Sequence, residues 1–110
     1  MRKLKINVPI FDQLIIVIQA ENMKSIDDYI QDTYNVNFGE LNPENRSGTT
    51  YNLPDTTIII GILPDVTTRV LVHETGHATF DLMRFVGINP QTDQETFCYI
   101  QEYIFDKIAT

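Results

Sequence analysis

The sequence contains a single cysteine, Cys98, and only two histidines among its 110 residues. A lone cysteine cannot form an internal disulfide, so the chain fits a reducing compartment and we expect a cytoplasmic location. Basic residues are also scarce: eight Lys and Arg against fifteen Asp and Glu give a formal net charge of −7. This charge argues against partners such as nucleic acid or an anionic membrane surface, because both would repel the chain.

Long hydrophobic runs are absent as well. The most apolar run, residues 14–18, is far shorter than the roughly 20 residues of a membrane-spanning helix. The N-terminus begins with basic residues, but Asn7, Pro9 and Asp12 interrupt its apolar stretch and no signal-peptide cleavage site follows. Hydrophobic residues make up 43% and charged residues 21% of the chain, as in ordinary folded proteins. We therefore expect one domain, residues 1–110.

The N-terminal half predicts two paired strands and a helix. Apolar and polar residues alternate over residues 4–8, and the apolar segment 14–19 follows a short turn, which predicts a hairpin. Ser25 suits the start of a helix. Residues 35–55 are rich in Asn, Gly and Pro and predict a long loop, whereas residues 56–62 are rich in Thr and Ile and predict a further strand.

Two helices are predicted in the C-terminal half. The first runs from about Val66 to Val86, and Gly87 with Pro90 just beyond it forms a typical C-terminal stop. The second runs from about Asp93 to Ile108. This order of elements predicts an α+β fold with a small antiparallel or mixed sheet and helices packed on one face.

Both histidines lie in the segment LVHETGHATF, residues 71–80. Residues four apart lie on the same face of a helix, so His73 and His77 can point ring nitrogens at one metal. Glu74 lies about 100° further round the helix, where it can reach a metal-bound water. This HExxH pattern predicts a Zn²⁺ site with Glu74 as the general base of peptide hydrolysis. The alternative is a solvated helix face that carries two histidines by chance.

Gly76 lies inside the same motif. A glycine costs about 1 kcal/mol relative to alanine in a helix interior, so we expect another backbone segment to approach closely there.

A catalytic zinc needs a third protein ligand and an open position. The acidic residues after the motif that could supply this ligand are Asp93, Glu95 and Glu102. Thr92 and Glu95 also have the spacing of a capping box, in which Glu95 would only bond back to the start of the last helix. On the sequence alone both roles of Glu95 stay open.

The motif HETGH and the segment Glu95-Thr96-Phe97-Cys98-Tyr99 resemble the small zincin-like metallopeptidases of phages and prophages. In size and element order the chain is similar to minigluzincins. The resemblance covers residues 56–104 in motif, and it implies a zincin-like fold, Glu95 as third zinc ligand and a peptide or protein substrate. Larger gluzincins often carry an acid where this chain has Tyr99, so we expect the zinc to be held less tightly. The metzincin extension is absent.

The resemblance also suggests where a substrate would bind. In gluzincins the strand before the active helix receives the substrate as an added strand, and residues 56–62 occupy that place. A central strand of the core is the alternative. Arg84 would either bind a substrate carboxylate or pair with Asp81 on the surface.

The remaining side chains carry weaker expectations. Cys98 is expected in the core. Three tyrosines are candidates for a donor to the reaction oxyanion, although each could equally be a packed aromatic: Tyr51, Tyr99 and Tyr103.

The leading functional hypothesis is a zinc-dependent peptidase. The first alternative is a catalytically weak or inactive zinc-binding interaction module. The second is a metal-free interaction protein in which the motif is coincidental.

Overall fold

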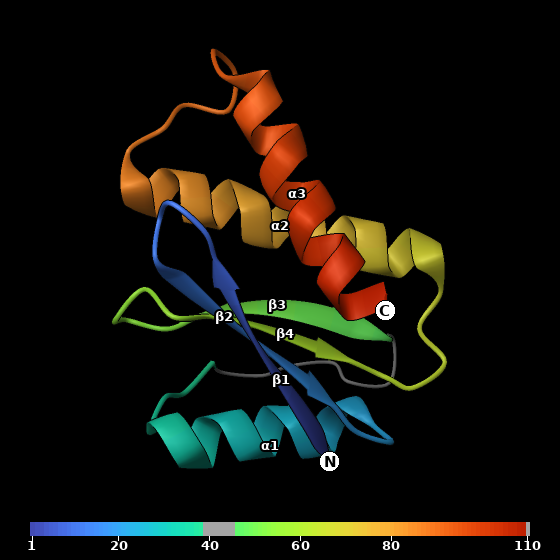
Figure 1. The fold of residues 1–110 in the computed structure, drawn as a ribbon. Helices are drawn as coiled ribbons and strands as arrows, with labels where there is room; N and C mark the ends of the chain where they lie inside the picture. The colour runs from blue at the N-terminus through green and yellow to red at the C-terminus, as the bar shows by residue number, and fades with distance from the viewer. Residues whose placement is uncertain (39–45, 110) are drawn as a thin grey trace.

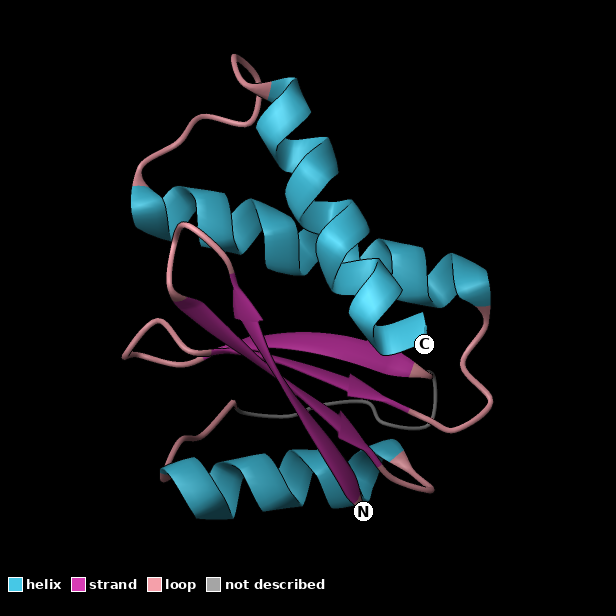
Figure 2. Ribbon diagram, viewed as in Figure 1, coloured by secondary structure: helices cyan, strands magenta, loops and turns pink. Residues whose placement is uncertain are grey.

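The structure is a computed structural model that describes residues 1–38 and 46–109. Its elements follow in the order β1 (Arg2–Val8), β2 (Gln13–Gln19), α1 (Met23–Tyr34), β3 (Gly48–Asn52), β4 (Ile58–Ile62), α2 (Thr68–Val86) and α3 (Gln94–Ala109). The four strands form one mixed sheet in the order β1-β2-β4-β3 (Figures 1 and 2). β1 and β3 run antiparallel to their neighbours, whereas β2 and β4 are parallel. The expected α+β class and the N-terminal hairpin are confirmed.

Helices cover both faces of the sheet. Figure 1 shows α1 on one side and α2 with α3 on the other. Along β2, Ile15 and Val17 pack in the cluster that includes α2 and α3, whereas Ile16 and Ile18 pack in the cluster that includes α1. The expectation that all helices lie on one face was therefore wrong. A run of four consecutive buried apolar residues is typical of a strand covered on both sides.

The helix boundaries agree with the predictions to within a few residues. α1 begins earlier than predicted, because Asn22 is the N-cap and its Oδ1 accepts a hydrogen bond from Ser25 N at 2.8 Å. α2 ends at Gly87, which has a left-handed φ of 80° as predicted for a glycine stop. Among the described residues no helix has the length and apolar character needed to cross a membrane.

Strand β3 lies inside the segment 35–55 that was predicted as a loop. Its Thr-Thr-Tyr centre is strand-forming, but the Asn, Gly and Pro residues around it concealed that signal. β3 pairs with β4 and has no described strand on its other side. The predicted strand 56–62, observed as β4, is central, so of its two expected positions the core strand is the observed one, and the edge next to it is formed by β3.

β3 is attached to α1 by a polar cluster of buried Asp27, buried Tyr51 and half-buried Arg46. The Tyr51 hydroxyl donates to Asp27 Oδ1 at 2.5 Å, and Arg46 donates to Asp27 Oδ2 and to Thr49 Oγ1. Burial and then the hydrogen bond to Asp27 raise the pKa of the Tyr51 hydroxyl above its ordinary value. Tyr51 is therefore a neutral structural donor on the face of the sheet opposite α2.

We expect Gly61→Ala to lower the free energy of unfolding by about 1–3 kcal/mol. An added Cβ would lie 2.8 Å from Cγ2 of Ile26 and 3.1 Å from the Tyr51 ring, so α1 would have to move away from β4. Urea denaturation followed by circular dichroism measures the change. Gly76→Ala is the matched control, because its Cβ meets only Gln101 Nε2 at 3.4 Å. Equal loss of stability in both variants would contradict this account of α1 packing.

Candidate functional site

His73 and His77 lie one turn apart on α2, and both side chains are exposed. Their Nε2 atoms are 3.0 Å apart, and the two rings meet edge to face with centroids 4.6 Å apart. Without a metal, this distance requires one ring nitrogen to donate a proton and the other to accept it. The helical spacing thus brings both ring nitrogens to one point in front of the helix, as predicted.

This arrangement of nitrogens fits zinc. Two ligand nitrogens about 2.0–2.1 Å from a tetrahedral zinc lie about 3.3 Å apart. The 3.0 Å between the two Nε2 atoms differs from that value by a few tenths of an ångström, which small rotations of the rings can supply. The histidine pair therefore offers two of the three protein ligands that a catalytic zinc site requires.

Glu74 points toward the sheet and is buried, with 7% of its surface exposed. Thr50 on β3 lies against it: the hydroxyl oxygen of Thr50 is 2.8 Å from Glu74 Oε1 and 3.0 Å from the Glu74 backbone carbonyl. A buried carboxylate needs such a donor to offset its lost hydration. The edge strand thus fixes the carboxylate beside the histidine pair, a role for Thr50 that the loop interpretation had missed.

Gly48 allows β3 to approach α2 this closely. A Cβ at Gly48 would lie 3.0 Å from Val70 Cγ1 and 3.2 Å from Glu74 Cγ. At Gly76, in contrast, an added Cβ would meet only the flexible side chain of Gln101. The close approach expected at Gly76 is therefore to a side chain and not to a backbone segment, and the tight contact lies at Gly48.

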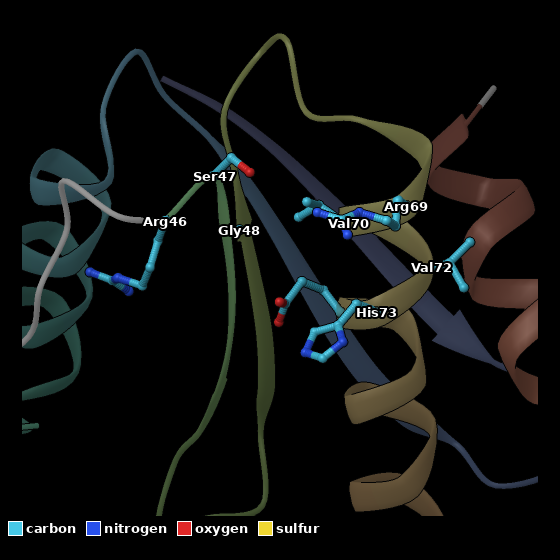
Figure 3. Close-up of a pocket in the computed structure, with 8 residues that line it drawn as sticks. Arg46, Ser47, Gly48, Arg69, Val70, Val72 and His73 are labelled. Atoms are coloured by element: carbon cyan, nitrogen blue, oxygen red, sulfur yellow. The ribbon is translucent and has the colours of Figure 1, made fainter.

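Two hollows open between α2 and β3, and we call them together the α2–β3 groove. The larger has a volume of about 610 Å³ and includes His73, Glu74 and Gly48 in its lining, with Arg69 and Val70 from the first turns of α2. Figure 3 shows the His73 ring on the strand side of α2, whereas Arg46 turns away toward α1.

The second hollow, of about 490 Å³, shares Glu74 and Gly48 with the first and adds His77, Asp81 and Asn52. Glu74 therefore lies where the two hollows meet, with one histidine in each. A carboxylate in this position faces an extended, solvent-accessible groove along the edge strand.

The described residues supply no third ligand as they stand. Among residues 1–38 and 46–109, no group of three or more His, Cys, Asp or Glu side chains is arranged to hold a metal. Glu95 is exposed near the start of α3, and the structure does not bring it to the histidine pair.

The N-terminal cap of α3 is Asp93, whose Oδ1 accepts a hydrogen bond from Thr96 N at 3.1 Å, so the predicted capping box of Thr92 and Glu95 is not formed. Hydrogen bonds from Thr96 lower the pKa of Asp93.

The middle of α3, and not its start, crosses the histidine motif. Gln101 Nε2 donates to the backbone carbonyl of Val72 at 3.0 Å, immediately before His73. Glu102 and Cys98 line a hollow of about 280 Å³ together with Val72. Of the three acidic candidates, Glu102 thus lies in a hollow that touches the motif. Cys98 is exposed, so the expectation that it belongs to the core was wrong.

Other residues singled out by the sequence lie outside the groove. Arg84 is 3.5 Å from Asp81 in the surface pair that was one of its two expected roles. Tyr51 donates to Asp27 on the opposite face of the sheet and so cannot serve an oxyanion in the groove. Tyr99 and Tyr103 are not among the residues that line either hollow of the groove.

The chain has no significant match among protein-family models, curated proteins or solved structures. The resemblance to zincin-like peptidases therefore stays a prediction that rests on the motif and on the geometry of its side chains.

We expect Thr50→Val to lower the free energy of unfolding by about 1–3 kcal/mol, because it leaves Glu74 buried without its hydroxyl donor. Thr50→Ser keeps a hydroxyl and is the matched control, with a loss below about 1 kcal/mol. Denaturation curves at neutral pH compare the two variants. If valine and serine destabilise the protein equally, the Thr50–Glu74 contact does not contribute in the way the structure indicates.

Proposed function

We propose that the protein is a zinc-dependent metallopeptidase of the zincin-like class. The observation that carries the proposal is the convergence of the His73 and His77 Nε2 atoms, 3.0 Å apart, beside the buried carboxylate of Glu74. Two ring nitrogens that could bind one metal, with an oriented carboxylate beside them, are three of the groups that metal-assisted hydrolysis with a general base needs, and a third metal ligand is the fourth. The groove along β3 gives a peptide access to all three groups.

Bound zinc would supply a water of lowered pKa and would polarise the scissile carbonyl. Glu74 would accept the proton of the attacking water and pass it to the leaving amine. Thr50 holds Glu74 through Oε1, and no described residue donates to Oε2. One carboxylate oxygen is therefore available for proton transfer while the other keeps the side chain in position.

An extended peptide is the substrate form that suits the groove. β3 is an edge strand of the described sheet, and its outer side can pair with an added strand. Such pairing would lay the peptide backbone between β3 and α2, beside Glu74 and both histidines. Because backbone pairing is independent of side chains, selectivity would have to come from the residues that line the two hollows.

Glu95 or Glu102 would complete the metal site. The resemblance to gluzincins implies Glu95, whereas the crossing of α2 and α3 favours Glu102, which lines a hollow beside Val72. Either residue would need a shift of α3 or of its own side chain, since no three-ligand group is present among the described residues. Removing each carboxylate separately distinguishes the two possibilities.

A zinc-binding interaction module without proteolysis is the second candidate function. The displacement of Glu95 from the histidine pair favours it, because a zinc without its third protein ligand would lack the coordination that a catalytic site uses to activate water.

We expect about one zinc per chain in protein purified without chelator, and its loss in His73→Ala and in His77→Ala. Of Glu95→Gln and Glu102→Gln, the variant that removes the true ligand should weaken zinc binding at least about tenfold, and the other should not. Competition with a chromogenic chelator measures the affinities. A wild-type protein that takes up no zinc even when zinc is added would refute the metal site.

We expect Glu74→Gln to bind zinc like the wild type and to cleave peptides at least about 10²-fold more slowly, because glutamine cannot accept the proton. Glutamine keeps the size of the side chain and can still accept the Thr50 hydrogen bond, so the fold should be retained. Cleavage of a fluorogenic peptide library provides the rate. A zinc-loaded wild type that cleaves nothing in the library would instead support the interaction module.

A further inference from the structure

The two ends of the α2–β3 groove carry opposite charges. Arg69 belongs to the larger hollow, next to His73 and Glu74. Asp81 belongs to the other hollow, next to His77 and Glu74. Arg69 thus lies toward one end of the groove and Asp81, which is paired with Arg84, toward the other, with Glu74 between them.

Arg69 is the cation of this groove whose charge is not already engaged. Arg46 lines both hollows, but its guanidinium binds Asp27 of α1 and Thr49. Arg69 is exposed, and within residues 1–38 and 46–109 no side chain forms an ion pair or a hydrogen bond with it. Its planar fork of donors is suited to a carboxylate that enters from solution.

The direction of β3 says which part of a peptide would meet Arg69. β3 follows Ser47, which lines only the hollow that contains Arg69, and ends at Asn52, which lines only the hollow that contains Asp81. A peptide that pairs antiparallel with β3 runs the opposite way, so its C-terminal part lies at Arg69 and its N-terminal part at Asp81. The charges agree with this direction, because a parallel peptide would bring its amino end toward the guanidinium.

We propose that Arg69 is a specificity-determining residue that binds a carboxylate on the C-terminal side of a peptide lying along β3. The carboxylate is either an acidic side chain or the free C-terminus. This inference rests on the proposed peptide-binding groove, and it names the class of peptide that the groove prefers. Arg69 would act on peptide affinity and orientation, whereas Glu74 would act on bond cleavage.

The test measures binding of N-terminally labelled octapeptides to zinc-loaded Glu74→Gln protein by fluorescence anisotropy. One peptide has a free C-terminus, a second is the same sequence with a C-terminal amide, and further amidated peptides carry one Glu or Gln at successive positions. We expect at least one carboxylate-bearing peptide to bind about fivefold to tenfold more tightly than its neutral counterpart, as a solvent-accessible charge-assisted contact allows. The amide pair and the Glu series distinguish the two sources of carboxylate.

The same comparison is made after adding Arg69→Gln, which should bring the ratio of affinities close to one and leave the neutral peptides unchanged. Arg2→Gln is the matched control, since it removes the same charge from β1 at the other edge of the sheet. The proposal would be overturned if the preference for carboxylate survives Arg69→Gln or is lost equally in Arg2→Gln. It would also be overturned if no peptide binds. An Arg69-dependent preference in a wild type that cleaves no peptide would support it while refuting the peptidase. Cleavage of peptides without any Arg69-dependent preference would support the peptidase and refute the role of Arg69.

Discussion

Strand β3 is held from both faces of the sheet, and each attachment ends on a buried carboxylate. On one face Thr50 donates to Glu74 of α2, and on the other Tyr51 and Arg46 donate to Asp27 of α1. These are the two buried acidic side chains of the described residues. Because a buried carboxylate must recover its lost hydration through hydrogen bonds, neither helix can move far along the sheet without a cost. The edge strand thereby fixes two helices that lie on opposite faces of the sheet.

The two carboxylates differ in how fully their oxygens are used. Asp27 has Tyr51 on Oδ1 and the Arg46 guanidinium on Oδ2, so both oxygens serve the attachment. Glu74 has a described donor, the neutral hydroxyl of Thr50, on Oε1. A further hydrogen bond or proton can therefore reach Glu74 from the groove without breaking an existing contact. Both carboxylates thus hold a helix to the edge strand, and Glu74 alone of the two keeps an oxygen without a described donor.

The sequence predicted the parts of the fold that depend on local patterns. Alternation in residues 4–8, the isoleucine-rich runs and Gly87 gave the hairpin, the central strand and the end of α2 close to their observed positions. β3 was missed because its strand-forming centre is short and lies among turn-forming residues. The placement of α1 on the second face was missed although consecutive buried isoleucines in β2 and β4 indicate two covered faces. The pairing of strands and the placement of helices on each face of the sheet depend on contacts between distant segments, which local sequence patterns do not specify.

The difference between local patterns and distant contacts also applies to the candidate site, which consists of the histidine pair and a possible third ligand. The meeting of His73 with His77 follows from the helical repeat alone, so the motif was enough to predict it. A third ligand depends on where α3 crosses α2, and Gln101 bonds to the Val72 carbonyl at that crossing. Glu95 precedes Gln101 by six residues, or about 9 Å along the helix axis. In the proposed zinc site a ligand from α3 would therefore be supplied more easily near Gln101 than near the helix start, so the position of this crossing limits which residue could complete the histidine pair.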